Sequence, residues 1–189
     1  MISVVIPTHD SEHLLVHTLA ALVPGALAGV VREVIVADGG SQDDTAKVAD
    51  VAGCHFMTLP GTRGARLAAA AASARADWLW FLQPGSIPDR TWIEEVECFI
   101  RDSERDGGEA KAAVLRRQAR RVGIGEAIAL AMASLGARPQ PQQGLLIAKA
   151  LYRELGGHDA ASDDPETTLL RKLGRRRIAV LACAMMQSA

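Results

Sequence analysis

The chain has 189 residues, 49% of them hydrophobic and 23% charged, which is the balance of one globular domain with a sizeable core. Its net charge of −1 provides no overall field for nucleic acid or an anionic membrane, so at most peripheral membrane contact is expected. Three widely spaced cysteines fit neither a metal site nor a disulfide framework, and they favour a reduced, cytoplasmic location. No signal peptide precedes the first predicted strand, and no apolar stretch is long enough to span a bilayer.

The first half of the chain alternates short apolar runs with helical patterns. Strands are predicted at residues 2–7, 34–37, 54–58 and 78–82. Helices are predicted at residues 13–22, where Pro24 and Gly25 end the helix, at 43–52, at 63–75, and from Pro88 to Arg105. This alternation predicts an α/β fold with a mostly parallel central sheet and helices on both faces.

The second half is less regular, and its pattern predicts a continuation of the same domain. Strands are predicted at residues 112–118, 145–147 and 177–181. Helices are predicted at residues 124–135, 149–155 and 164–173. The turn near Gly107 separates two parts of one domain, because neither a repeat nor a linker interrupts the chain.

The stretch Glu33–Thr45 carries the clearest chemical signal. Asp38 stands where an apolar run ends, and the two glycines that follow it permit a sharp turn or the close approach of a ligand. Ser41 then fits a helix N-cap. An acidic side chain at the carboxyl end of a strand, followed by glycines and a helix start, is typical of nucleotide sites in open α/β sheets. A capped strand-to-helix turn without a ligand is the alternative.

Three separated stretches, taken together and in order, resemble family-2 glycosyltransferases. Val4–Thr8, with two acidic residues after it, looks like the opening strand of that family, and Val34–Ser41 is similar to its second strand and nucleotide-binding turn. The acidic run Asp163–Glu166, which follows a glycine pair, resembles the acceptor-side segment. The turn Gly61–Arg66 is similar to that of the small, soluble branch of the family.

The resemblance implies the GT-A fold, a three-layer sandwich of nucleotide-diphospho-sugar transferases. Residues 1–106 would form the nucleotide-binding half of a single domain, and residues 107–189 the acceptor-side half. The implied activity is transfer of a sugar from a nucleotide-diphospho-sugar to an acceptor. The donor sugar, the acceptor and the oligomeric state stay open.

Such a transferase needs a nucleoside pocket, positive charge at the pyrophosphate, and a base that activates the acceptor hydroxyl. Arginines near a helix start can meet phosphate oxygens, although a solvated helix face is the alternative. Asp163 or Asp164 is the candidate catalytic base, with helix capping as the alternative. The candidate substrate-binding residues are Pro7, Thr8, Asp10, Glu12, Asp38, Gly39, Arg63, Arg66 and Gln83.

The chain departs from the family pattern after the strand at 78–82. The family has an Asp-x-Asp type pair there, which holds Mn²⁺ or Mg²⁺ on the pyrophosphate, whereas this chain has Gln83, Pro84 and Gly85. Hard cations prefer carboxylate oxygens, and these three residues supply none. The cation expected for the family therefore lacks its ligands, which predicts turnover that is metal-independent or absent.

The sequence bears differently on two other classes of function. A non-catalytic nucleotide-sugar-binding protein that has lost the metal site fits the same motifs, so it remains the alternative. A dinucleotide-dependent oxidoreductase is excluded because no G-x-G-x-x-G turn follows the first strand, where the chain has Pro7–Ser11.

Overall fold

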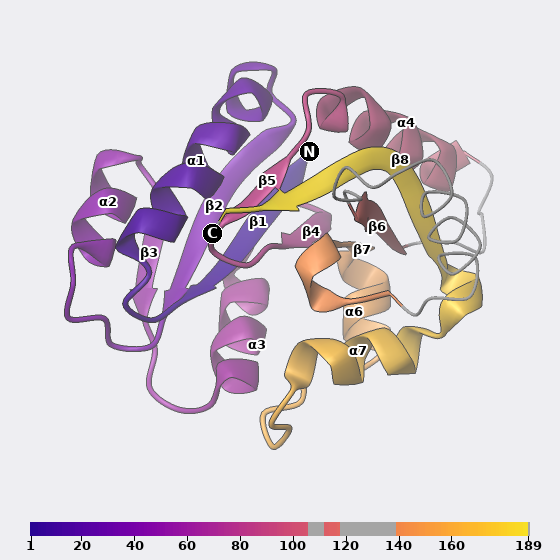
Figure 1. Ribbon diagram of the computed structural model, residues 1–189. Helices are drawn as coiled ribbons and strands as arrows, with labels where there is room; N and C mark the ends of the chain where they lie inside the picture. Colours follow the sequence, from indigo (N-terminus) through magenta and orange to yellow (C-terminus); the bar gives the residue numbers. More distant parts are fainter. Residues whose placement is uncertain (106–111, 118–138, 189) are drawn as a thin grey trace, which may run out of the picture.

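The computed structural model describes residues 1–105, 112–117 and 139–188. The described strands form one sheet in the order β3-β2-β1-β4-β7-β6-β8-β5 (Figure 1). The strands are β1 (Ile2–Thr8), β2 (Val31–Asp38), β3 (His55–Thr58), β4 (Trp78–Phe81), β5 (Ser86–Pro88), β6 (Ala112–Arg117), β7 (Leu145–Ala148) and β8 (Ile178–Gln187). The helices are α1 (Glu12–Leu27), α2 (Thr45–Val51), α3 (Arg63–Ser73), α4 (Trp92–Arg105), α6 (Lys149–Glu154) and α7 (Pro165–Leu173), with short 3-10 turns η1 (Pro141–Gln143) and η2 (Arg175–Arg177).

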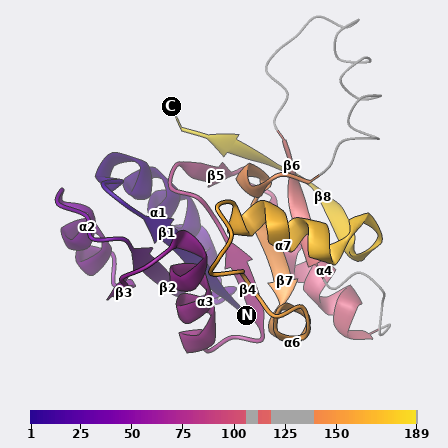
Figure 2. The ribbon, with the colours of Figure 1, turned by 90° about the horizontal axis from the view of Figure 1, so that it is seen from below.

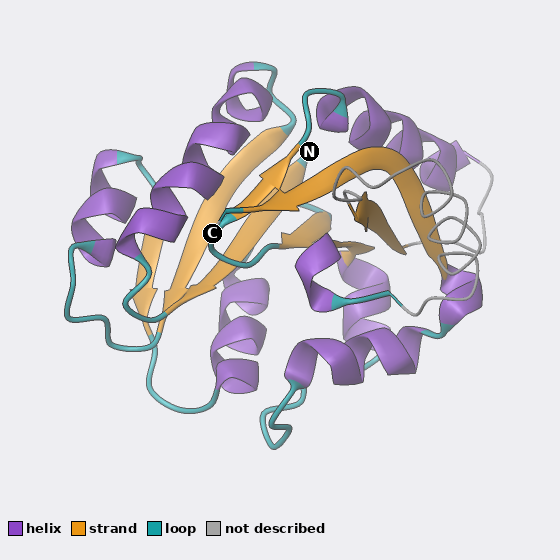
Figure 3. Cartoon of the chain, in the orientation of Figure 1, coloured by secondary structure: helices purple, strands orange, loops and turns teal. Residues whose placement is uncertain are grey.

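Helices cover both faces of the sheet, as Figure 3 shows. One buried cluster packs α1, α2 and α4 against side chains such as Val4 and Trp80, and a second packs α3, α6 and α7 against side chains such as Val5 and Phe81. Neighbouring strand residues thus alternate between the two cores, as the pleat of a strand requires. The result is a three-layer α/β sandwich.

The sheet confirms the predicted mixed, mostly parallel topology. β1 pairs in parallel with β2 and β4, β2 with β3, and β6 with β8. β7 runs antiparallel to β4 and β6, and β5 runs antiparallel to β8. The carboxyl ends of β1, β2 and β4 therefore meet at one edge of the sheet.

Two predicted boundaries are wrong because tertiary contacts override local signals. Pro24 and Gly25 do not end α1, which continues to Leu27. Proline near a helix end removes only one hydrogen bond. The Trp92 ring packs against Gly25 so closely that a Cβ atom on residue 25 would lie 2.2 Å from Cη2 of Trp92. Pro88 does not open a helix either, since it closes β5, and α4 begins at Trp92.

Two further differences concern a cap and a strand length. Asp44, not Ser41, is the N-cap residue of α2. The last strand is longer than the predicted 177–181, because residues 185–187 pair with β5. The predicted helix at 124–135 lies outside the described residues. In the described part of the chain, no helix is both long and apolar enough to cross a membrane.

Candidate active site at the carboxyl edge of the sheet

Asp38 lies at the carboxyl end of β2, directly beside Thr8 at the end of β1. One of its carboxylate oxygens accepts hydrogen bonds from the hydroxyls of Thr8 (2.8 Å) and Ser41 (2.5 Å). The other accepts from the backbone N–H groups of Gly40 and Ser41, both at 2.8 Å. These four bonds fill the lone-pair sites of a carboxylate, so direct contact with a nucleotide would require exchange of one of them.

The environment of Asp38 keeps its carboxylate ionised. Burial opposes ionisation, since the residue is only 1% exposed, but hydrogen bonds from Ser41, Thr8 and Gly40 outweigh burial and hold the pKa of Asp38 below its ordinary value. The negative charge is thus a fixed feature of the turn after β2.

The exposed loop after β1 is tied to the loop after β2. The backbone N–H of Asp10 donates to the Ser41 hydroxyl (2.9 Å), and the Asp10 carboxylate accepts from the backbone N–H of Gln42 (2.7 Å). Glu12 joins this network through its backbone N–H, which donates to Asp43 (3.0 Å). The nucleoside-side residues predicted from sequence therefore do lie together, at one end of two paired strands.

The two candidate phosphate-binding arginines have different surroundings. The Arg63 Nε atom donates to the carboxylate of Glu166 at 2.7 Å, in an ion pair between α3 and α7. The Arg66 guanidinium lies against Gly39, and one of its terminal nitrogens donates to the carbonyl of Gly61 (2.8 Å). Figure 2, the view from below, shows how α3 and α7 from the two halves of the sequence lie near each other.

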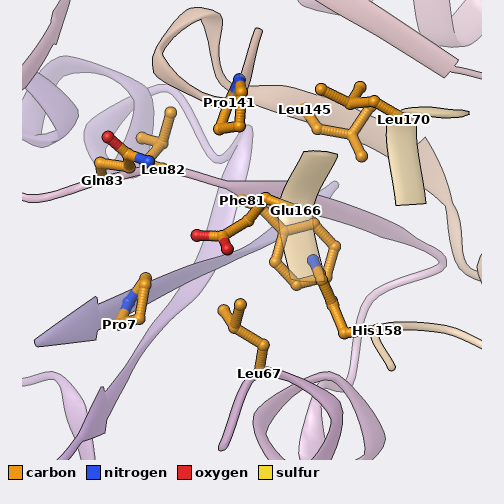
Figure 4. A pocket seen from close by; sticks show the side chains of 10 residues that line it. All are labelled: Pro7, Leu67, Phe81, Leu82, Gln83, Pro141, Leu145, His158, Glu166 and Leu170. Atoms are coloured by element: carbon orange, nitrogen blue, oxygen red, sulfur yellow. The ribbon is translucent and has the colours of Figure 1, made fainter. Parts of the chain in front are cut away.

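A pocket opens where these elements meet beyond the end of β4 (Figure 4). It is small, since the space within it that water can enter is about 20 Å³, room for about one water molecule, and its wall is mostly apolar. Glu166 directs its carboxylate toward the side of the pocket where Pro7 and Gln83 lie, and His158 occupies the other side (Figure 4). The lining residues are Pro7, Leu67, Phe81, Leu82, Gln83, Pro141, Leu145, His158, Glu166 and Leu170.

His158 is a buried and neutral part of this wall. Burial, reinforced by the positive charges of Arg63 and Lys172, lowers its pKa to about 3. The hydroxyl of Tyr152 accepts from the His158 backbone N–H (3.1 Å) and lies 3.0 Å from Nδ1. Which atom donates in the contact with Nδ1 depends on the tautomer of the ring. The buried Nε2 atom has no hydrogen-bond partner among the described residues.

The predicted catalytic carboxylates lie at the start of α7. Asp163 is exposed and is absent from the pocket wall. Asp164 is the N-cap residue, and the hydrogen bond from Thr167 holds the pKa of its carboxyl below the ordinary value. Glu166, which was predicted only as part of the acidic run, and His158 also line the pocket. Glu166 lies in the first turn of α7, two residues after the predicted Asp164.

The comparisons with known proteins agree with this geometry. The family model described as glycosyl transferase family 2 matches residues 3–110 of the chain. The chain belongs to this family. Membership confirms the resemblance seen in the sequence and makes the protein a glycosyltransferase by family. No curated protein matches the chain in sequence.

Solved structures of glycosyltransferases share the fold. Glucosyl-3-phosphoglycerate synthase from Mycobacterium tuberculosis, solved with Mn²⁺, UDP and glucosyl-3-phosphoglycerate, superposes with a TM-score of 0.70 at 21% identity, over 100% of this chain and 72% of that chain. S. aureus TarS 1-349 gives a TM-score of 0.71 at 17% identity, over 96% of this chain and 58% of that one. These likenesses establish the GT-A fold.

Proposed function

We propose that the protein binds a nucleotide-diphospho-sugar at the carboxyl ends of β1, β2 and β4 and transfers the sugar to an acceptor hydroxyl. The observation that carries this proposal is the pocket beyond β4, which adjoins the Thr8 and Asp38 turn through Pro7. A nucleoside held at that turn would present its sugar to the pocket. Uridine is the first nucleoside to test, because the structural neighbour was solved with UDP.

Residues 1–106 would act as the nucleotide-binding half of one domain, and residues 107–189 as the acceptor-side half. The pocket supports this division, because Pro7 and Leu67 come from the first half while Glu166 and Leu170 come from the second. The Arg63–Glu166 ion pair joins the two halves beside the pocket. In transfer, the acceptor oxygen attacks the anomeric carbon, its proton passes to a base, and the nucleoside diphosphate leaves.

The panel that tests this function is a thermal-shift series with UDP, GDP and their glucose conjugates. A ligand that binds the native state alone raises the melting temperature by mass action. We expect at least one diphosphate to do so, and its sugar conjugate to do the same. If none of the four ligands shifts the melting temperature, the proposal is wrong.

The base can be assigned with three variants that preserve shape and remove basicity. Asp164→Asn keeps the helix cap, since asparagine caps as well as aspartate, and Asp163→Asn and Glu166→Gln are its matched partners. Loss of the base should lower kcat by about 10²–10⁴-fold with little change in KM. If all three variants keep the kcat of the wild type, none of these carboxylates is the base.

A non-catalytic nucleotide-sugar-binding protein is the second candidate. The observation that favours it is the segment from Gln83 to Gly85, which offers no carboxylate at the end of β4. Incubation with UDP-glucose and a set of sugar acceptors separates the two functions. Release of UDP indicates a transferase, whereas bound and intact UDP-glucose under every condition indicates a binding protein.

A further inference from the structure

The turn after β4 offers no carboxylate to a metal ion. Gly85 has a φ of +86°, a conformation that other residues rarely adopt. Its N–H donates to the carbonyl of Leu14 (3.1 Å), and its own carbonyl accepts from the N–H of Ser188 (2.8 Å). Both backbone groups are thus held, and the position where the family carries an acidic side chain has no side chain at all.

The end of β8 holds this turn in place. Ser86 pairs with Gln187, whose amide donates to the Ser86 hydroxyl (3.1 Å) and to the carbonyl of Gln142 (2.9 Å). The Ser188 hydroxyl also lies 2.7 Å from Nδ1 of His17. Among the described residues, no cluster of three His, Cys, Asp or Glu side chains could hold a metal ion. The misfit with the divalent cation that the family implies rests on the chemistry of Gln83, Pro84 and Gly85, which supply no carboxylate where the family has an acidic pair.

A departing diphosphate still needs positive charge, and the two arginines of α3 differ in their capacity to supply it. Arg63 is already neutralised by Glu166. Within the described residues, Arg66 has no carboxylate partner within 4.0 Å, and its buried Nε atom has no hydrogen-bond partner. A buried donor without a partner costs free energy. Because this nitrogen is enclosed by protein, a phosphate would meet the terminal nitrogens of the guanidinium, one of which donates to the Gly61 carbonyl.

The position of Arg66 places that charge at the nucleotide edge. A Cβ atom on Gly39 would lie 3.0 Å from Cζ of Arg66 and 3.1 Å from each terminal nitrogen. These nearly equal distances mean that the guanidinium lies flat over Gly39, in the turn that follows Asp38. Gly39 therefore permits the arginine to approach the backbone of the nucleotide turn.

We propose that this site binds the diphosphate of its donor without a divalent cation, and that the Arg66 guanidinium supplies the positive charge instead. The inference rests on the proposed function, since it concerns the same donor site. Arginine suits this role because its planar fork donates to phosphate oxygens in pairs.

The first test measures UDP binding by calorimetry at constant ionic strength, with EDTA and then with Mn²⁺. We expect the two dissociation constants to agree within about twofold. A tenfold gain with Mn²⁺, about 1.4 kcal/mol, would overturn metal-free binding and leave the proposed function standing. Absence of binding in both buffers for UDP, GDP and their glucose conjugates alike would overturn the proposed function itself, and this inference with it.

The second test compares Arg66→Met with Arg63→Met, using UDP and uridine as probes. Arg66→Met should weaken UDP binding about tenfold or more, because a hydrogen bond to a charged group is lost, and leave uridine binding unchanged. Arg63→Met tests the other candidate arginine and should weaken UDP binding less than threefold, because Glu166 already pairs with its charge. Arg32→Met is the control that should leave UDP binding unchanged, because Arg32 is exposed at the end of β2 opposite Asp38. Arg66→Lys keeps the positive charge, so it should bind UDP more tightly than Arg66→Met does. This partial recovery would show that the loss in Arg66→Met is not a folding defect.

An equal or larger loss of UDP affinity in Arg63→Met would overturn the assignment to Arg66. An equal loss of uridine and UDP affinity in Arg66→Met would do so as well, because it would show that the arginine supports the nucleoside or the fold, not the phosphates. Melting temperatures of the unliganded variants provide the check on folding.

Discussion

The turns after β2 and β4 lie at the same edge of the sheet but are built in opposite ways. After β2, the acidic Asp38 is surrounded by hydrogen-bond donors, and every lone pair of its carboxylate is used. After β4, the backbone of Gly85 is fixed by Leu14 and Ser188, and no acidic side chain is present. The first turn is organised by a side chain, and the second by its backbone.

The difference teaches where a ligand finds free hydrogen-bonding groups. Asp38 is the residue that the motif marks most clearly, but its acceptor sites are all used by hydrogen bonds within the protein. The buried side-chain nitrogens that lack partners among the described residues belong to Arg66, Trp80 and His158. Trp80 lies on β4 and the ring of His158 packs against Phe81, at 4.6 Å between centroids. Arg66 and His158 lie on the face of the sheet that α3, α6 and α7 cover, whereas Trp80 lies in the core on the opposite face.

The largest effect is expected from Asp38→Ala. The substitution leaves two hydroxyls and two N–H groups without their acceptor in a buried turn, so unfolding free energy should fall by about 2–4 kcal/mol. Urea denaturation of the purified variant measures this loss. If the variant unfolds within 0.5 kcal/mol of the wild type, about the scatter of a surface substitution, the carboxylate does not organise the turn.

Asp38→Asn is the matched control, because it keeps an acceptor oxygen and loses the charge. It should lie between the wild type and Asp38→Ala. The pKa of Asp38 is lowered from 3.8 in the folded protein, so its contribution is present above that pH and is lost as the pH falls through the lower folded value. The advantage of the wild type over Asp38→Asn should therefore shrink below about pH 4.

The sequence predicted the first turn well because its signals are local. An apolar run, an acid and two glycines determine the end of β2 within a few residues. The same pattern gave the wrong role to Ser41, whose hydroxyl binds Asp38 and accepts from Asp10, 31 residues away along the chain. A capping signal and a loop cross-link use the same side-chain chemistry, and only the fold decides between them.

The second turn and the pocket depend on contacts that no local pattern encodes. Pro88 looked like a helix start because the residue that it pairs with, Met185 of β8, comes almost a hundred residues later. The buried place of His158 arises from packing against Phe81 and Tyr152. The missing acidic pair was visible in the sequence, but the positive φ of Gly85 was not.

The second prediction concerns the buried histidine on the β4 side. The pKa of His158 is about 3 in the folded protein and 6.5 ordinarily. At a pH between these two values, the unfolded state therefore binds a proton that the folded state does not bind. Stability should therefore fall as the pH drops from 6.5, by about 1.4 kcal/mol per pH unit. Wild type and His158→Phe, unfolded in urea from pH 7 to pH 5, provide the measurement.

The difference between the two proteins isolates His158, since all other titrating groups are shared. The difference in unfolding free energy between wild type and His158→Phe should change by about 2 kcal/mol between pH 6.5 and pH 5. Because His158→Phe removes the ring partner of the Tyr152 hydroxyl, the double variant Tyr152→Phe/His158→Phe serves as the control. Parallel stability curves for wild type and both variants would mean that the ring protonates freely in the folded state.

The third prediction tests whether the backbone fixes the turn after β4. Gly85→Ala forces a left-handed conformation on a residue with a Cβ, and should cost about 1 kcal/mol. Gly29→Ala is the control, because Gly29 has a similar φ of +74° with no atom within 4 Å of the added carbon. The two losses in urea denaturation should be comparable. If the unfolding free energy of Gly85→Ala falls by less than a few tenths of a kcal/mol while that of Gly29→Ala falls by about 1 kcal/mol, the turn after β4 re-forms with another φ. A side chain at residue 85, such as a carboxylate, would then be tolerated.

The smallest effect is expected where the two sides of the pocket are joined, at the Arg63–Glu166 ion pair. The side chains are 36% and 14% exposed, so solvent screens part of their attraction, and a coupling of about 0.5 kcal/mol is expected. A double-mutant cycle with Arg63→Met and Glu166→Gln measures it from urea denaturation. The coupling should shrink at high salt, whereas the hydrogen bonds around Asp38, being buried, should not respond. A coupling of several kcal/mol would mean that Arg63 and Glu166 hold the two halves together as firmly as the Asp38 network holds its turn, and the contrast between the two sides of the site would fail.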